Sequence, residues 1–206
     1  MHNFGFKVMD KNPGLLGPIL DYAIRHGRPV EVGLYSGDQQ ALELLEDQLF
    51  SASIPVSAHT DHERCHAFNL HCTQDLLDEH IRLALTLGSA YSVLHAANLP
   101  MTLRAARRPA LLNLLLDNLE RAEELCEVYN YRLHLENVYH PVSFYRYLFE
   151  GILARGLSRI HFCFDFGHAK VWSGVTLEDW IDFMDDLAAM GFGKAKAAVD
   201  DVAPSP

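Results

Sequence analysis

Residues 131–137 read YRLHLEN, and residues 159–168 read RIHFCFDFGH. In both stretches apolar and polar residues alternate one by one. This period of two predicts β-strands with one apolar and one polar face, because successive side chains of a strand point to opposite sides. Each stretch carries a carboxylate near its end, Glu136 in the first and Asp165 in the second. We therefore expect two strands with acidic side chains at their carboxyl ends.

Four similar runs precede these two stretches, and a helical pattern follows each of the six. The six expected strands cover residues 4–9, 30–35, 54–59, 91–95, 131–137 and 159–166. The expected helices cover residues 15–26, 39–50, 74–87, 109–129, 142–154 and 177–190. Regular alternation of strands and helices predicts a parallel sheet with right-handed crossovers.

The polar face of the strands favours one arrangement of such a sheet. An open doubly wound sheet would bury these polar groups under helices, whereas a barrel has an interior and carries its site at the carboxyl ends of the strands. We therefore predict an α/β fold, an incomplete TIM-type (β/α) barrel with about six of the eight βα units. The barrel domain is expected over residues 1–190, and residues 191–206, which are small and polar, as a flexible tail.

Potential metal ligands occur at the ends of four successive strands: His59, His95, Glu136 and Asp165. Imidazole and carboxylate suit zinc, manganese or iron, so we predict a divalent-metal site, with a structural polar network as the alternative. The loop after the third strand holds a competing group, whose spacing fits no standard zinc module. We interpret this group as a polar loop, with a second zinc site or a substrate lid left open; it comprises His59, His62, Cys65, His66, His71 and Cys72.

Composition limits the partners and the compartment. The 206 residues carry a formal net charge of -10, which weakens a nucleic-acid role, and we expect no nucleic-acid partner. No apolar stretch approaches the ~20 residues of a membrane span, and none resembles a signal peptide. The four cysteines form no CxxC pair, so we predict a reduced, cytoplasmic setting without a membrane partner.

Two segments resemble a known superfamily. LHLENVYH (residues 133–140) and HFCFDFGHAKVWSG (residues 161–174) are similar to the fifth and sixth strand segments of the xylose isomerase-like TIM barrels, which include endonuclease IV and many sugar isomerases and epimerases. The resemblance covers about residues 4–190. It implies that Glu136 and Asp165 are metal ligands, and that His168 is a third-metal ligand in the endonuclease branch or contacts substrate in the epimerase branch. It also implies that His59 and His95 bind the first zinc ion of the endonuclease type.

The sequence departs from this superfamily in several places. It lacks counterparts of two further strands, which carry a His and a carboxylate, and of an Asp-x-His segment in the endonuclease branch. By the resemblance, only the first metal position is complete, from His59, His95 and Glu136, while the second has only Glu136 and Asp165. The basic loop of the endonuclease branch is replaced by SGDQQ at residues 36–40, and the Tyr that usually follows the strand-three His is replaced by TDH at residues 60–62.

The resemblance implies a sugar or sugar-phosphate isomerase or epimerase that acts on a small carbohydrate-like substrate. The metal would polarise adjacent substrate oxygens, and Glu136 or a neighbour would move the proton. The alternatives are an endonuclease IV-like phosphodiesterase in DNA repair, a related oxidase with several irons, and a non-catalytic truncated remnant. Six strands would leave the first and sixth with unpaired edges, so we expect a homo-oligomer.

Overall fold

The computed structural model describes residues 5–98, 107–172 and 176–192 of the chain. Within these ranges one sheet contains six strands, which pair in parallel and follow one another in chain order. This confirms the predicted fold, an incomplete α/β barrel. The strands are β1 (Phe6–Met9), β2 (Val30–Gly33), β3 (Val56–His59), β4 (Ser92–His95), β5 (Leu133–Glu136) and β6 (Ile160–Cys163).

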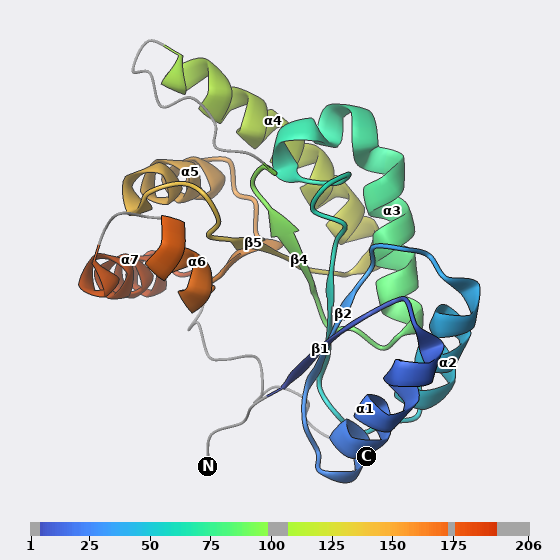
Figure 1. The fold of residues 1–206 in the computed structure, drawn as a ribbon. Helices are drawn as coiled ribbons and strands as arrows, with labels where there is room; N and C mark the ends of the chain where they lie inside the picture. Colours follow the sequence, from blue (N-terminus) through green and yellow to red (C-terminus); the bar gives the residue numbers. More distant parts are fainter. Residues whose placement is uncertain (1–4, 99–106, 173–175, 193–206) are drawn as a thin grey trace, which may run out of the picture.

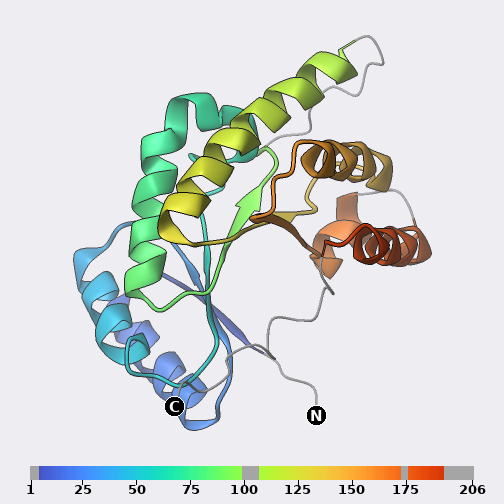
Figure 2. The same ribbon diagram turned by 180° about the vertical axis from the view of Figure 1, so that it is seen from behind.

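Helices follow the strands and lie along the outer side of the curved sheet (Figures 1 and 2). They are α1 (Pro13–Arg25), α2 (Gln39–Leu49), α3 (Leu70–Thr86), α4 (Arg108–Tyr129), α5 (Val142–Ala154), α6 (Phe166–Trp172) and α7 (Leu177–Ala189), with a 3-10 turn at Ala67–Asn69 before α3. The sequence pattern did not predict α6, because its 7 residues span only about two turns and show no helical repeat.

The two faces of the sheet differ as the alternation predicted. Val32, Ala58 and Leu135 are fully buried on the side that the helices cover. On the other face, the ammonium of Lys7 lies 2.8 Å from the carboxylate of Glu31. The strand register then brings the carboxyl ends of the strands together, because His95 pairs with Glu136 on the neighbouring strand.

An aromatic cluster covers the outer face of β6. Trp180 and Phe183 of α7 are almost completely buried, and their rings lie 6.2 and 5.2 Å from the ring of Phe162. Thr176 caps the N-terminus of this helix: its hydroxyl accepts from the backbone N–H of Asp179, and the carboxylate of Asp179 accepts from the backbone N–H of Thr176.

The carboxyl-terminal end of the described chain packs against the same cluster. The ring of Phe192 lies 5.2 Å from that of Phe149. The division into a domain of residues 1–190 and a tail of residues 191–206 stays a prediction, because residues 193–206 lie outside the described ranges. All four cysteines lie within these ranges and are free thiols. Every helix in the described part of the chain is too short or too polar to cross a lipid bilayer.

Candidate metal centre

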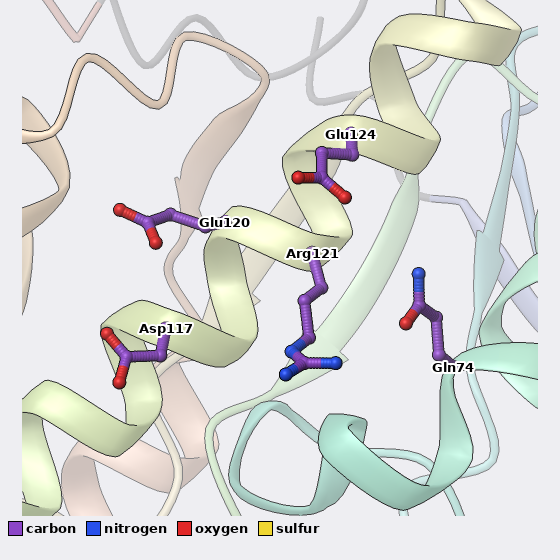
Figure 3. A pocket seen from close by; sticks show the side chains of 5 residues that line it. All are labelled: Gln74, Asp117, Glu120, Arg121 and Glu124. Carbon is purple, nitrogen blue, oxygen red and sulfur yellow. The ribbon is translucent and has the colours of Figure 1, made fainter.

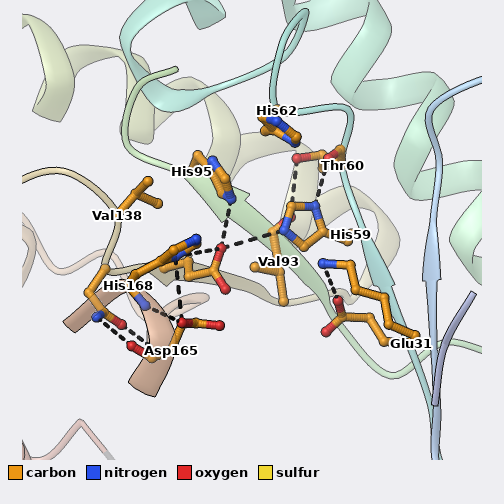
Figure 4. A network of polar contacts seen from close by, with 12 residues as sticks. Glu31, His59, Thr60, His62, Val93, His95, Val138, Asp165 and His168 are labelled. Atoms are coloured by element: carbon orange, nitrogen blue, oxygen red, sulfur yellow. Dashed lines mark hydrogen bonds and ion pairs between the residues drawn. The ribbon is translucent and has the colours of Figure 1, made fainter. Parts of the chain in front are cut away.

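Three histidines surround one carboxylate oxygen at the ends of the strands. Oε2 of Glu136 lies 2.7 Å from Nε2 of His95 and 3.5 Å from Nε2 of His59. Nδ1 of His168 approaches the same oxygen at 3.9 Å. Dashed lines in Figure 4 mark these contacts, which converge from β3, β4 and α6 on the end of β5. Three of the four residues expose at most 6% of their surface: His59, His95 and Glu136.

Contacts of one ring nitrogen, Nδ1, fix the orientation of the His59 ring. Its Nδ1 lies 2.8 Å from the carbonyl oxygen of Thr60 and 2.9 Å from the hydroxyl of Tyr35. The carbonyl can only accept, so Nδ1 carries the proton and donates to it. Nε2 is then left with its lone pair toward Glu136. Metal-binding histidines are commonly held in this way by an acceptor on the second ring nitrogen.

Asn137, the residue after Glu136, positions the loop that carries Asp165. The side chain of Asn137 accepts from the backbone N–H of Asp165 at 2.6 Å and donates to its carbonyl oxygen at 2.8 Å. The carboxylate of Asp165 in turn accepts from the backbone N–H of His168 at 2.6 Å. His168 lies in the first turn of helix α6.

The strand end itself is held by a buried phenol. Tyr145 of α5 is completely buried, and its hydroxyl donates to the carbonyl oxygen of Glu136 at 3.1 Å. The same hydroxyl accepts from the backbone N–H of Val138 at 2.9 Å. Both polar groups are thereby satisfied where the strand leaves the sheet, and the Glu136 side chain is fixed at its base.

The electrostatics favour the protonation states that bind metal. Burial raises the pKa of Glu136, but its interactions with His59 and His95 outweigh that effect, and the pKa lies well below its ordinary value. Burial, together with the neighbouring His59 and His62, lowers the pKa of His95 by more than Glu136 raises it. An ionised carboxylate therefore faces a neutral imidazole at neutral pH. These are the forms in which both groups act as ligands.

The donors fall into two adjacent groups. Within the described residues, one group of three is His59, His62 and His95, and the other is Glu136, Asp165 and His168; in each, the ligand atoms lie within 4.8 Å of one another. The competing loop group does not assemble as a whole, since Cys65, His66, His71 and Cys72 belong to neither set. Cys65 is instead part of the core, where burial raises its pKa to about 12.

The spacing fits a metal ion. Zinc binds histidine nitrogen and carboxylate oxygen at about 2.0–2.2 Å, so two donors of a tetrahedral site lie about 3.4 Å apart. The two distances from Glu136 to His95 and His59, 2.7 and 3.5 Å, bracket this value. Small side-chain adjustments would therefore bring the donors onto one ion.

Solved structures with the same fold are similar to this chain. One is the TTHB071 protein from Thermus thermophilus soaked with ZnCl2, with a TM-score of 0.70 and 19% identity over 88% of this chain and 74% of the other. A second is the 3-keto-D-glucoside 4-epimerase YcjR from E. coli, with a TM-score of 0.66 and 14% identity over 90% and 76%. A third is an AP endonuclease, family 2, from Brucella melitensis, with a TM-score of 0.61 and 14% identity over 88% and 76%.

The chain has an incomplete TIM-barrel fold and is similar in structure to xylose isomerase-like TIM barrels. Other structures with this fold carry names such as D-tagatose 3-epimerase-like protein and L-ribulose 3-epimerase. At such low identities the likeness establishes the fold and no reaction. No family model matches the sequence. A search of curated proteins also gives no match.

Within this TIM-barrel fold, all five predicted ligands come together at the carboxyl ends of the strands: His59, His95, Glu136, Asp165 and His168. Their role as ligands stays a prediction. A shallow pocket on the helical exterior contains none of them (Figure 3); it is lined by Gln74 of α3 and by Asp117, Glu120, Arg121 and Glu124 of α4.

The sequence did not predict the residues that hold the ligand side chains in place. Tyr35 lies beyond the end of β2, and its backbone N–H donates to the carboxylate of Asp10 at 2.9 Å. That carboxylate also accepts from the backbone N–H groups of Ser36 and Gly37. His62 was placed only in the loop group, although its distance of three residues from His59 was a usable signal.

Proposed function

We propose that the chain binds a divalent ion, zinc, manganese or iron, and acts as a sugar isomerase or epimerase. The observation that carries the proposal is the pair of contacts from His95 and His59 to Glu136, at 2.7 and 3.5 Å, where a TIM barrel carries its active site. The substrate would be a small carbohydrate-like molecule, in keeping with the epimerase names of several structures with this fold.

The residues divide the work as follows. A bound divalent ion supplies Lewis acidity, which polarises adjacent oxygens of an α-hydroxy carbonyl. His59, His95 and Glu136 would hold it, and Asp165 and His168 lie next to it on the side of β6. The low pKa of Glu136 suits a ligand, so its contacts support binding more strongly than the proton transfer predicted for it.

Two neighbours of Glu136 can move a proton in its place. The side chains of Asp165 and His168 expose 38% and 31% of their surface, and Oδ1 of Asp165 lies 3.8 Å from Nδ1 of His168. Both therefore reach solvent, whereas Glu136 is buried. We assign the proton transfer to this pair. Glu136, the predicted catalytic group, is the alternative.

The likeness to an AP endonuclease keeps DNA as the competing substrate. Charge and loop structure disfavour it. The net charge is -10, and the loop of residues 36–40 contains no basic residue. The backbone N–H groups of Ser36 and Gly37 in that loop are already bound to Asp10, at 2.8 and 2.7 Å. They are therefore not available to a phosphate.

Metal analysis tests the site. The wild-type chain should hold about one tight divalent ion, and His95→Ala should lose it because the variant removes the imidazole nearest to Glu136. His71→Ala is the matched control, since His71 is exposed and lies in neither donor group. Equal metal content in the wild type and in His95→Ala would overturn the assignment.

Solvent exchange tests the reaction. The metal-loaded chain is incubated in D2O with a panel of ketoses and aldoses, and NMR follows deuterium uptake at the carbon next to the carbonyl. We expect uptake with at least one sugar, and none in His95→Ala. Tight metal binding without uptake for any sugar would contradict the isomerase proposal and favour a non-catalytic binding role.

A further inference from the structure

We propose that His62 is a ligand of the same ion, so that three imidazoles and the Glu136 carboxylate bind it together. This inference rests on the proposed metal site. One ring nitrogen of His62 lies within 4.8 Å of a ring nitrogen of both His59 and His95. The resemblance to the superfamily gives no such ligand, because it places a tyrosine in this loop.

The ring of His62 is packed against the other two. It is stacked on the ring of His95, with the centroids 4.8 Å apart and the planes at 28°. It lies edge-on to the ring of His59 at 6.1 Å. Figure 4 shows His62 beside His95, on the side away from Asp165. The ion would therefore have imidazoles on three sides.

The loop that carries His62 is tied down on both sides of the residue. Before it, the backbone N–H of Thr60 donates to the carbonyl oxygen of Val93 at 3.0 Å. After it, the buried carboxylate of Asp61 accepts from the backbone N–H of Glu63 at 3.0 Å. A short loop anchored in this way holds its histidine in place without help from the ion, as a binding site requires.

One phenol touches both of the histidines from this segment. The hydroxyl of Tyr35 lies 2.9 Å from Nδ1 of His59 and 3.3 Å from Nδ1 of His62. Its oxygen can accept the Nδ1–H of His62, and it shares the Nδ1–H of His59 with the carbonyl oxygen of Thr60, so both Nε2 atoms keep their lone pairs. Tyr35 therefore acts as a positioning residue, and it prepares two imidazoles for one ion.

The added ligand changes what the site can do. Three histidines and one carboxylate fill a tetrahedral zinc site, whereas catalytic zinc usually keeps one position open. His62 is half-buried and is the only one of the four donors that lies on a loop rather than a strand. His62 would complete the donor set from this loop, and of the four donors it is the one that a loop movement could withdraw.

Cobalt(II) titration tests the inference without any activity assay. The wild-type chain should give the intense visible absorption of a tetrahedral cobalt site. His62→Ala should weaken that absorption and lower cobalt affinity at least about tenfold, since even the loss of an outer-shell partner costs about 10- to 100-fold. His71→Ala is again the control and should match the wild type.

A second variant distinguishes the loss of a metal ligand from damage to the loop that carries it. In His62→Cys a thiolate replaces the imidazole, and thiolates also bind this class of metal. A sulfur-to-cobalt charge-transfer band, absent from the wild type, should appear in the near ultraviolet only if residue 62 touches the ion. Wild-type affinity in His62→Ala together with no such band in His62→Cys would overturn the inference. The metal site itself would survive that result, because it is judged by His95→Ala.

Discussion

Asp10 should contribute strongly to stability, although it lies outside the candidate centre. Only 1% of its surface is exposed, and its carboxylate accepts from the backbone N–H groups of Tyr35, Ser36 and Gly37 at 2.9, 2.8 and 2.7 Å. Hydrogen bonds to a charged group contribute about 1.5–3 kcal/mol each. The three N–H groups share the two oxygens of one carboxylate and water can reach part of the loop, so we expect Asp10→Ala to lower the free energy of unfolding by about 3–4 kcal/mol.

The comparison is made by urea unfolding followed by circular dichroism. In a chain of 206 residues, about 3–4 kcal/mol corresponds to a fall in melting temperature of roughly 6–16 °C. Asp10→Asn keeps one acceptor oxygen and should lie between Asp10→Ala and the wild type. Asp38→Ala is the matched control, because this carboxylate on the same loop caps α2 through a single backbone N–H at 3.1 Å and should cost about 1 kcal/mol. An Asp10→Ala chain no less stable than Asp38→Ala would refute the reasoning.

Three further predictions concern association, DNA and pH. Strands β1 and β6 each have one partner in the described sheet, so light scattering at micromolar concentration should show a dimer or larger; a monodisperse monomer with a sharp melt would count against this. A low-salt titration with abasic duplex should show no submicromolar affinity, and salt-sensitive tight binding would restore the endonuclease alternative. Burial lowers the pKa of His80 below its ordinary value of 6.5, so the unfolded chain binds the extra proton and stability should fall as the pH drops below about 6.5, by at most about 1.4 kcal/mol per pH unit for this group. Urea unfolding at pH 7.5 and 5.5 should show a smaller loss for His80→Gln, and an equal loss would contradict the assignment.

The strands and most helices could be predicted because they follow simple periods. The alternation in each strand gave its faces, and the observed strands are shorter only because pairing extends over 4 residues. Helix α3 begins at Leu70 rather than residue 74. Its backbone departs from helical geometry at Thr73, where φ is -128°, and the Thr73 hydroxyl donates to the carbonyl oxygen of Asn69. The pattern therefore indicated only the regular part of this helix.

The candidate site was predictable to the extent that it lies on strand ends. Parallel strands place their carboxyl ends side by side, so the strand pattern alone was enough to bring His59, His95 and Glu136 together. Tyr35 and Asp10 could not be related in this way, because they are 25 residues apart and meet only through the conformation of a loop. Loops carry no period that relates two distant residues.

The order of the strands also bears on how the protein is made. In the described sheet each strand pairs only with its neighbours in the chain, from β1 to β6. No strand of this sheet pairs with a strand that is synthesised much later. Each new βα unit can therefore pair with the strand made just before it. Assembly can therefore advance in step with synthesis, and an exposed sheet edge exists at every stage of it. The nascent chain therefore carries an aggregation hazard at both edges of the growing sheet, at β1 and at the strand most recently added.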